Sequence, residues 1–382
     1  MKNGINLHVY PSQMTHESRI LKESKCICDL DLFERIVLVG MWREGLKENE
    51  DLGDGRVIWR VKTKTSKLRL PFRLSRIINL WEWKWRILRR FREENVAMVN
   101  CHNLATLPLG YDFKRTQQSK LVYDTHELET ERGWPSFIAN HARNVERRLI
   151  GKADLTVVVS ESIRQWYNSK YNINDPLVIR NIPPAYNLEN RKKVDLKAHF
   201  GIPNNQLMFI FQGALGAGRC VEIVLEAFKR CKHDRHVVFM GFGQLQSTVE
   251  NAAQKYANIH FHPAVNPSEV LDHTRSADVG IHLLTPDSLN HKLTLGNKPF
   301  EYLLAGLPFL ESDYTEGARF VKENSCGWLV ETAVEPILSK VNELDRSDIK
   351  DKREIVMRIR NDFSWEKESN HFGEKVAAMF CL

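Results

Sequence analysis

The sequence lacks any hydrophobic run long enough to cross a membrane. A transmembrane helix needs about 20 consecutive apolar residues, and the apolar residues of this chain, 42% of its 382 residues, occur only in much shorter runs. The chain also starts without a secretory hydrophobic segment, because residues 1–4 lead straight into a short strand-like run. Low-complexity stretches and Pro/Ser-rich linkers are missing as well. We therefore expect a protein that is folded throughout, soluble and located in the cytosol.

Cysteine pairs with the spacing of a metal site are also missing. The seven cysteines are scattered, and only Cys26 and Cys28 lie close together in the sequence. A zinc site of the Cys/His type needs a second pair of ligands nearby, and none follows these two residues. We expect reduced thiols and no structural metal ion.

Positive charge is concentrated in one segment. The chain carries a formal net charge of +7, but residues 56–92 alone contain thirteen lysines and arginines and one acidic residue, Glu82. The rest of the chain is therefore net acidic. A local basic block of this kind favours an anionic partner surface, for which nucleic acid and a membrane are the two candidates.

Short runs rich in apolar and β-branched residues alternate with helix-like segments. They lie at 5–10, 36–40, 96–100, 120–124, 155–159 and 177–179, and again at 207–211, 236–240, 259–261, 279–283, 308–311 and 328–330. This alternation is typical of parallel sheets covered by helices. The polar stretch 187–193 indicates a linker, so the sequence predicts an α/β protein with two Rossmann-like, doubly wound domains, 1–185 and 186–362. Ligands of such sheets bind beyond the carboxyl ends of the strands, and we expect the site in a cleft that the two domains face.

Two glycine-containing turns follow predicted strands of the second domain. The first contains Gly213, Gly216 and Gly218 and ends in Arg219, and the second contains Gly241 and Gly243. A helix is predicted directly after Arg219, so a diphosphate there would meet free N–H groups and a guanidinium. Ordinary strand–helix turns also contain glycines, so each turn alone is a weak signal.

A sharper signal lies where a loop enters a predicted helix at Pro299. Residues 296–308 read Gly-Asn-Lys-Pro-Phe-Glu-Tyr-Leu-Leu-Ala-Gly-Leu-Pro, which puts Glu301 on the first helical turn and Asn297 and Lys298 just ahead of it. A carboxylate at this position could complement the helix dipole. It could equally accept hydrogen bonds from both hydroxyls of a ribose. Lys298 can reach a phosphate.

This run resembles the donor-site element of the GT-B glycosyltransferases, specifically the retaining glycosyltransferase family 4 (glycosyl transferases group 1). In that family a Glu starts a helix that ends in an Ala-x-Gly-x-Pro turn, and the resemblance implies that Glu301 binds the nucleotide ribose. Further segments that resemble the family lie at 15–23, 99–109, 123–127, 153–160, 179–183 and 363–366. The last resembles the terminal helix that crosses back, so residues 363–382 are expected to join the first domain.

Polar residues at strand ends of the first domain supply the remaining candidates. His126 and Glu127 resemble the family's catalytic His-Asp/Glu strand end, and both follow a buried strand. A single histidine at a strand end is usually structural, but His102 and His126 on successive strands favour a site. The candidates on the acceptor side are His16, Glu17, Arg19, His102 and Asn103.

The sequence departs from the family pattern at two positions. The family often has two Glu residues eight positions apart, and the first would fall on Leu293. The family's Arg and Lys that hold the diphosphate would align with Ala214 and Arg219, so only the second keeps its charge. Lys298 could restore the missing cation.

The resemblance implies a glycosyltransferase that moves a sugar from a nucleotide-sugar donor to a hydroxyl of a glycan or lipid-linked acceptor, with retention, as in the assembly of bacterial-type surface polysaccharides. Its catalytic residues would be His126, Glu127, Arg219 and Lys298, and its donor-binding residues Gly213, Gly218, Gly241, Gly243, Asn297 and Glu301. The nucleotide sugar is a substrate, and we expect no cofactor and no metal, because fixed cations and a helix terminus can stabilise the leaving diphosphate.

Three alternatives stay open. A nucleotide-sugar epimerase shares this architecture but needs acid/base residues that we cannot place. An inactive scaffold of the same fold is compatible with Leu293 and Ala214. A nucleic-acid-binding protein would use the basic block, but it would not explain Glu301, so we expect no nucleic-acid partner.

The basic block also predicts where the enzyme works. Residues 70–91 form a predicted helix in which Leu70, Leu74, Ile77, Ile78, Trp81, Trp85 and Leu88 share one face, expected to pack on the sheet. Trp83 then faces outward among Arg76, Arg86 and Arg90. Tryptophan and arginine on an outward face suit an anionic membrane. We therefore expect residues 56–92 to make peripheral contact with the inner face of the cytoplasmic membrane, with an anionic glycan as the alternative ligand.

Overall fold

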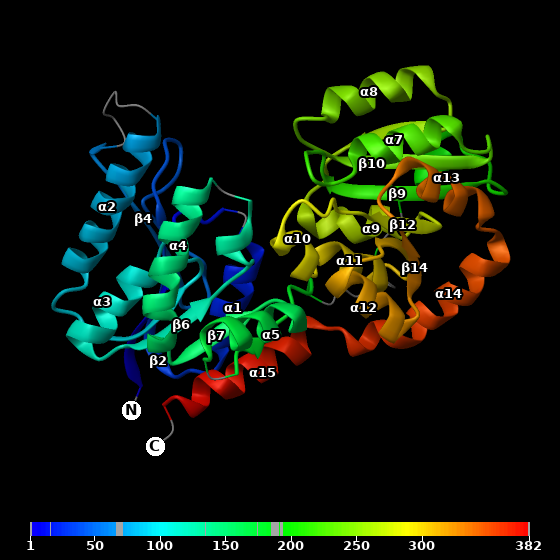
Figure 1. The fold of residues 1–382 in the computed structure, drawn as a ribbon. Coiled ribbons are helices and arrows are strands. Elements are labelled where there is room, and N and C mark those ends of the chain that lie inside the picture. Colours follow the sequence, from blue (N-terminus) through cyan, green and yellow to red (C-terminus); the bar gives the residue numbers. More distant parts are fainter. Residues whose placement is uncertain are drawn as a thin grey trace. The chain divides into compact units, whose positions relative to one another are not determined.

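The chain forms two compact units, Met1–Arg180 with Glu368–Leu382, and Asn181–Lys367 (Figure 1). The computed structural model describes residues 2–15, 17–65, 72–133, 135–173, 175–184, 191 and 194–380. The domain boundary expected between 185 and 186, and most of the expected linker, lie outside the described residues. Each unit is a parallel-sheet α/β domain, which confirms the predicted fold class. None of the described helices is both long and apolar enough to cross a membrane.

The first unit contains one eight-stranded sheet in the order β3-β4-β2-β1-β5-β6-β7-β8. Among its described strands, β3 and β4 are the one antiparallel pair. The strands are β1 (Asn3–Val9), β2 (Phe33–Met41), β3 (Asn49–Asp51), β4 (Arg56–Val61), β5 (Val96–Cys101), β6 (Lys120–Asp124), β7 (Leu155–Val158) and β8 (Leu177–Val178).

Strand β4 lies inside the basic block, where the sequence predicts no strand. Two of its arginines, Arg56 and Arg60, are buried. Arg56 binds Asp54, and Nε of Arg60 donates to the carbonyl oxygen of Gln13 at 2.6 Å. Part of the basic block therefore serves the interior of the first unit and is not available to an anionic partner.

The helices of the first unit are α1 (Ser18–Asp29), α2 (Phe72–Arg90), α3 (Leu107–Gln117), α4 (Ser136–Leu149), α5 (Glu161–Tyr171) and the terminal α15 (Trp365–Ala378). Helix α3 contacts both α2 and α4. Helix α15 instead lies against α1, where the thiol of Cys26 donates to the carbonyl oxygen of Ser369. The ring of Phe380 also packs edge-on against Phe33. The end of the chain thus belongs to the first unit.

Helix α2 turns the face opposite to the expected one toward the sheet. Trp83 is completely buried, and its Nε1 donates to the carbonyl oxygen of Gly40 on β2 at 2.9 Å. Trp81 and Trp85, which were expected to pack on the sheet, are exposed. The prediction that Trp83 faces outward is therefore wrong, because apolar residues occur all around this helix and the fit of Trp83 against β2 decides which face is buried. The expected helix start at Leu70 lies outside the described residues.

The second unit contains a six-stranded, fully parallel sheet in the order β11-β10-β9-β12-β13-β14. Its strands are β9 (Leu207–Ala214), β10 (Arg235–Phe242), β11 (Ile259–Pro263), β12 (Val279–His282), β13 (Phe309–Ser312) and β14 (Gly327–Val330). Its helices are α6 (Leu196–Phe200), α7 (Val221–Arg230), α8 (Gln246–Lys255), α9 (Val270–Thr274), α10 (Leu289–Leu293), α11 (Asn297–Leu304), α12 (Thr315–Asn324), α13 (Val334–Glu343) and α14 (Arg346–Ile359). Two separate apolar clusters form its core.

The strand order reverses beside the first strand of each unit. Strand β1 lies between β2 and β5, and β9 lies between β10 and β12. Ligands of doubly wound sheets bind beyond the carboxyl ends of the strands at such a reversal. The side chains that follow β1, β5 and β9 are therefore the first candidates for a site in each unit.

Candidate active site

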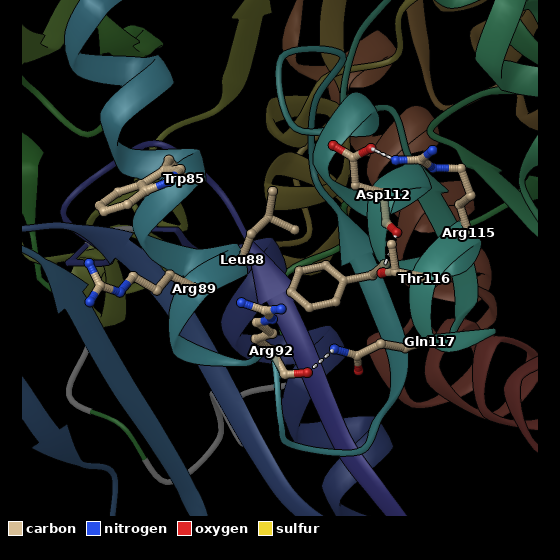
Figure 2. A pocket seen from close by; sticks show the side chains of 9 residues that line it. Trp85, Leu88, Arg89, Arg92, Asp112, Arg115, Thr116 and Gln117 are labelled. Carbon is tan, nitrogen blue, oxygen red and sulfur yellow. Dashed lines mark hydrogen bonds and ion pairs between the residues drawn. The ribbon is translucent and has the colours of Figure 1, made fainter.

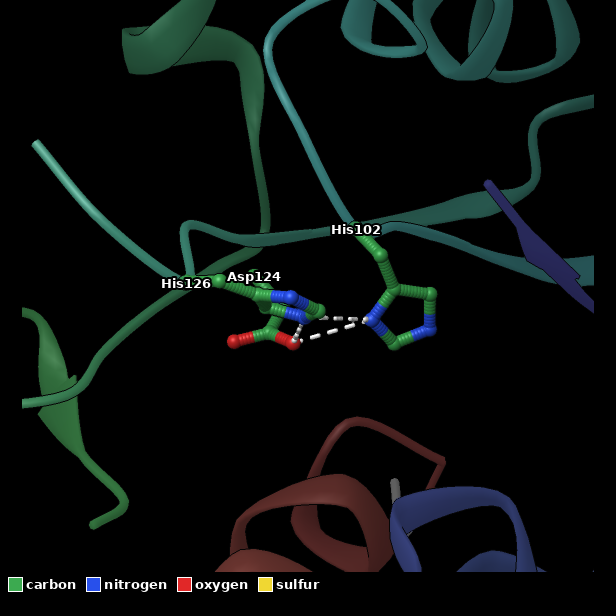
Figure 3. A group of neighbouring side chains, drawn as sticks. All are labelled: His102, Asp124 and His126. Atoms are coloured by element: carbon green, nitrogen blue, oxygen red, sulfur yellow. Dashed lines mark hydrogen bonds and ion pairs between the residues drawn. The ribbon is translucent and has the colours of Figure 1, made fainter. Parts of the chain in front are cut away.

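Three polar side chains meet at the carboxyl edge of the first sheet: His102, Asp124 and His126 (Figure 3). Asp124 ends β6, and His102 directly follows β5. Oδ2 of Asp124 lies 2.9 Å from Nδ1 of His102 and 2.7 Å from Nε2 of His126. A carboxylate accepts hydrogen bonds, so each of these ring nitrogens carries its proton.

Asp124 is held ionised by a buried arginine. Nη2 of Arg19 lies 2.8 Å from Oδ1 of Asp124, and Nη1 of Arg19 donates to the carbonyl oxygen of Ile179 at 2.8 Å. Burial by itself would raise the pKa of Asp124, but Arg19 and the two histidines hold it well below its ordinary value. Burial raises the pKa of neighbouring Glu23 well above its ordinary value, although Nε of Arg19 lies 2.9 Å from Oε1 of Glu23. Arg19, expected on the acceptor side, is buried and forms an ion pair with Asp124.

A second buried histidine extends this network to the middle of the sheet. Nδ1 of His8, on β1, lies 2.9 Å from Nε2 of His102. Burial lowers the pKa of His102 to about 4, and burial followed by His102 lowers the pKa of His8 well below its ordinary value, so both rings are neutral. Because Nδ1 of His102 carries its proton for Asp124, Nε2 of His102 must accept from His8. The chain of donors therefore runs from His8 through His102 to Asp124.

His126 is the member of this network that reaches solvent, because its side chain is 25% exposed whereas those of His102 and Asp124 are buried. Its Nε2 proton is used on Asp124, which leaves Nδ1 to face a ligand. The ring centroid of Tyr10 lies 5.8 Å away. The buried network thus fixes one orientation of one exposed imidazole and leaves its second ring nitrogen available to a ligand.

The other candidates of the first unit lie near this edge but outside the network. Glu127 is half-exposed and pairs with Arg132 at 3.1 Å. Oδ1 of Asn103 accepts from the backbone N–H of Thr106 at 3.0 Å, where the chain enters α3. Glu17 immediately precedes α1. His16 lies outside the described residues.

Among the residues that the structure describes, His102, Asp124 and His126 also form the one group whose spacing could hold a metal ion. The carboxylate of Asp124 already has Arg19 at 2.8 Å and a proton donor on each histidine. Each of these contacts has the geometry of a hydrogen bond. The carboxylate of Asp124 is thus surrounded by one cation and two N–H donors of the protein.

In the second unit, two glycine turns approach each other closely. Gly213 on β9 pairs with Gly241 on β10. A Cβ on Gly241 would lie 1.9 Å from the carbonyl oxygen of Gly213, and one on Gly243 would lie 2.3 Å from that of Leu215. Gly213 also adopts a φ of +102°, which side chains disfavour. These positions admit only glycine, and they leave backbone exposed at the carboxyl ends of two central strands.

Lys298 reaches the first glycine turn from helix α11. Its Cε would lie 2.9 Å from a Cβ on Gly213, and its Nζ lies 4.7 Å from the ring centroid of Phe211. Burial and the charge of Arg219 lower the pKa of Lys298 to about 7. Arg219 belongs to the turn that follows Gly213, so Lys298 and Arg219 bring two basic side chains to the same turn. A similar contact involves Gly218, where a Cβ would lie 2.9 Å from Cε1 of His291.

Glu301 lies on the second turn of α11, because this helix begins at Asn297 and has no acidic residue in its first turn. The expectation of a first-turn carboxylate is therefore wrong, and a helix-dipole role loses its basis. Its Oε2 instead accepts from Nε2 of Gln212 at 2.6 Å. Oε1 of Gln212 accepts in turn from Thr274. Two residues from other elements thus orient the carboxylate of Glu301.

Tyr302 fixes helix α11 to the sheet beside Glu301. Its hydroxyl lies 2.9 Å from the carbonyl oxygen of Ile281 and 3.3 Å from that of Ile210. A Cβ on Gly280 would lie 2.6 Å from the Tyr302 ring, so this close approach requires glycine. The start of α11, with Asn297 exposed on its first turn, is thereby held over the ends of β9 and β12.

The residues that orient the candidates were not among the predicted site residues. Asp124 ends the predicted strand 120–124 and Gln212 directly follows the predicted strand 207–211, and these positions were the available signal. His8 and Thr274 gave no signal, because they are brought in by strand pairing and helix packing between segments far apart in sequence.

The chain matches two family models along most of its length. Glycosyltransferase Family 4 matches residues 35–190, and Glycosyl transferases group 1 matches residues 192–359. No curated protein sequence matches it.

Solved glycosyltransferase structures share the whole fold. The sucrose-phosphate synthase of Thermosynechococcus elongatus superposes with a TM-score of 0.73 at 14% identity, covering 99% of both chains. HepE of Anabaena in complex with UDP gives 0.72 at 15% identity, covering 99% of this chain and 100% of its own. WaaG, a glycosyltransferase involved in lipopolysaccharide biosynthesis, gives 0.68 at 14% identity, covering 97% of this chain and 98% of its own. Together with the family models, these matches place the chain in glycosyltransferase family 4, with the GT-B fold.

Proposed function

We propose that the protein transfers a sugar from a nucleotide-sugar donor to a hydroxyl of a glycan or lipid-linked acceptor, with retention of the anomeric configuration. The observation that carries this proposal is the arrangement around Gly213, where Lys298, Arg219 and the oriented carboxylate of Glu301 come from separate elements to one strand end. The second unit is the donor unit in this proposal, and the first unit holds the acceptor.

Each group of the second unit has a role in donor binding. Glu301 accepts hydrogen bonds from the ribose hydroxyls, because an ionised carboxylate has two acceptor oxygens for a vicinal diol. Lys298 and Arg219 face the diphosphate, together with the N–H groups at the start of α7. Negative charge develops on the diphosphate as the bond to the sugar breaks, and these groups stabilise it electrostatically.

In this proposal the first unit orients the transferred sugar. Nδ1 of His126 binds a hydroxyl of the transferred sugar, while Asp124 and His102 keep the imidazole in place. With retention, the acceptor hydroxyl attacks from the side that the diphosphate leaves, and a donor phosphate oxygen takes the acceptor proton. The first unit therefore needs no separate general base.

Two structural neighbours guide the choice of substrates. HepE has been determined with UDP and with UDP-glucose, so a UDP-sugar is the first donor to test. WaaG is involved in lipopolysaccharide biosynthesis. By analogy we propose a role in the assembly of a surface polysaccharide or glycoconjugate, and action as a peripheral protein on the cytoplasmic face of the membrane.

The direct test is a screen of UDP-, GDP-, dTDP- and CMP-sugars for thermal stabilisation and for hydrolysis by the full chain. A donor that binds the folded protein raises its Tm by mass action. Stabilisation without hydrolysis or transfer by any of the four classes would favour an inactive scaffold, and interconversion of two nucleotide sugars would favour an epimerase. Stabilisation by none of them would contradict the proposal.

Chelation of divalent ions should leave most of the activity intact. Arg219 and Lys298 already supply fixed positive charge at the proposed diphosphate site, so no metal is needed to stabilise the leaving group. The measurement is the initial rate of transfer with and without EDTA. A complete loss that Mg²⁺ or Mn²⁺ restores would contradict the metal-independent mechanism.

Donor affinity should fall as the pH rises above about 7. Lys298, whose pKa is about 7 in the free protein, is protonated below that value and largely neutral above it. A bound diphosphate favours the charged form, so binding above pH 7 must be accompanied by proton uptake, and affinity falls by up to about tenfold per pH unit. Calorimetry in two buffers of different ionisation enthalpy, about one unit above that pKa, measures the uptake. Lys298→Met should abolish it, and absence of uptake by the native protein would place the diphosphate elsewhere.

A further inference from the structure

Helix α2 presents a row of large apolar side chains to solvent. Ile77 and Trp81 are 67% and 69% exposed, and Leu74 and Trp85 are 47% and 45% exposed. Spacings of three and four residues place all four on one stripe of the helix. This stripe, the α2 ridge, contains four of the large apolar residues that the first unit exposes.

The α2 ridge is not a loosely packed part of the core. The opposite face of the helix already supplies the core through Trp83, Ile87 and Phe91, which are almost completely buried. The ridge residues therefore do not contribute to the core of the first unit. A contiguous exposed apolar surface of this kind marks a contact with a partner or a membrane.

Positive charge flanks the ridge on the side of α3. A groove of about 790 Å³ lies between the two helices and is lined by Trp85, Leu88, Arg89, Arg92, Asp112, Phe113, Arg115, Thr116 and Gln117 (Figure 2). The Arg89 guanidinium lies 5.3 Å from the centroid of the Trp85 ring. The one carboxylate of the lining, Asp112, lies 3.8 Å from Arg115. The groove therefore keeps a net positive charge, and Trp85 belongs to both the groove and the ridge.

A second groove, of about 420 Å³, lies on the other side of the ridge and shares Trp85 and Arg89 with the first. Its further cations are engaged, since Arg86 pairs with Glu82 and Arg90 with Glu94. Of the three arginines expected to face a partner, Arg86 and Arg90 are thus engaged and Arg76 has a contact of its own, so the available cations are others. They are Arg89 and Arg92, which have no carboxylate partner within the described part of the chain.

We propose that the α2 ridge and the groove beside it form a docking surface for an anionic phospholipid leaflet. Trp81, Trp85 and the aliphatic residues of the ridge enter the interfacial layer, where amphipathic aromatic rings are stable. Arg89 and Arg92 bind lipid phosphates from the groove, as guanidinium groups do. A second copy of this chain would bring the same positive charge to the ridge, so charge favours the lipid surface over self-association.

The location of this surface is also suited to the entry of a lipid-linked acceptor. Helices that follow parallel strands begin at the carboxyl edge of the sheet, so the first turns of α2 lie on the same edge as His126. The first turn of α4, which follows β6, exposes Phe137 there as well. This part of the inference rests on the proposed function: the ridge starts at the edge of His126 and ends near Arg89 and Arg92 at the other end of α2, so a lipid-linked acceptor in the same leaflet would reach the first unit along the ridge.

Co-sedimentation with vesicles tests the surface. We expect the full chain to bind vesicles of phosphatidylcholine with phosphatidylglycerol, to bind less as salt increases, and not to bind phosphatidylcholine alone. The double variant Trp81→Ser/Arg89→Glu should reduce the bound fraction about tenfold or more at low salt. A matched control is Met357→Ser/Arg358→Glu, which removes one exposed apolar residue and one exposed arginine from α14 in the second unit and should bind normally.

Four outcomes would overturn the inference: no binding at low salt, equal binding to neutral vesicles, an equal loss in the control variant, or native binding by Trp81→Ser/Arg89→Glu. A change of native mass on ultracentrifugation in that variant, without vesicle binding by the native chain, would assign the ridge to self-association. Retention of a single-stranded oligonucleotide in place of vesicles would assign it to nucleic acid. Donor-induced thermal stabilisation is measured on the same variants and should be unchanged, so failure of the membrane surface is distinguishable from failure of the proposed transferase.

Discussion

Replacing Glu301 by alanine should raise the dissociation constant of the nucleotide-sugar donor by about 10²- to 10⁴-fold. The reason is the loss of two hydrogen bonds from an ionised acceptor to the ribose, at about 1.5–3 kcal/mol each. Each 1.4 kcal/mol corresponds to a factor of ten in the dissociation constant. Calorimetric titration of the native and variant chains with the donor found by the screen measures the change.

Gln212 provides the control for this result. It donates to Oε2 of Glu301 at 2.6 Å but comes from β9, so it orients the carboxylate without being a proposed ribose ligand. Gln212→Leu should weaken donor binding less than Glu301→Ala does, and Glu301→Gln should fall between the native protein and the alanine variant. Unchanged donor affinity in Glu301→Ala, with a native Tm, would mean that the nucleotide binds somewhere else.

The parallel strands could be predicted from sequence because their residues are buried on both faces. Runs such as 96–99 and 207–211 are continuously apolar, and they lie within β5 and β9. Strand β4 was missed because Arg56 and Arg60 interrupt its apolar pattern. Their guanidinium groups also donate to backbone carbonyl oxygens far away in sequence, that of Leu21 on α1 for Arg56 and that of Gln13 for Arg60, and no local pattern reveals such partners.

For a related reason, the sequence could not predict which face of helix α2 is buried. A helical period identifies which residues share a face, but it identifies the buried face only when the other face is polar. Here Ile77 and Trp81 lie on one face and Trp83 and Ile87 on the other. The choice depends on where the indole N–H of Trp83 finds an acceptor, which is the backbone of Gly40 on a neighbouring strand.

Positions at strand ends indicated which candidate side chains would lie close together. Parallel strands end at one edge, so His102 and His126 were expected to be near each other, and they are. What the sequence could not give is the arrangement behind them. His8 joins through the pairing of β1 with β5, and Gln212 meets Glu301 across 89 residues of chain.

Replacing His126 by alanine should lower kcat by about 10²-fold while changing the donor KM much less. A hydrogen bond to the transferred sugar that is strongest in the transition state affects turnover more than ground-state binding, and loss of one such preorganised contact typically costs about 10²–10³ in rate. The Tm should stay close to native, because the side chain is partly exposed at the end of the network. Steady-state kinetics with the donor varied at saturating acceptor separates the two parameters.

Asp124→Asn separates this role from a structural one. The substitution removes the carboxylate that lies 2.8 Å from Nη2 of buried Arg19, and removing one partner of a buried ion pair costs about 3–5 kcal/mol. We therefore expect Asp124→Asn to lower the Tm strongly, whereas His126→Ala lowers kcat without doing so. His126→Gln, whose amide can still bind a hydroxyl, should recover part of the lost turnover. If His126→Ala keeps near-native turnover, or if its loss of activity follows a matching loss of stability, His126 is only a structural end to the network and the transferred sugar is oriented by other residues.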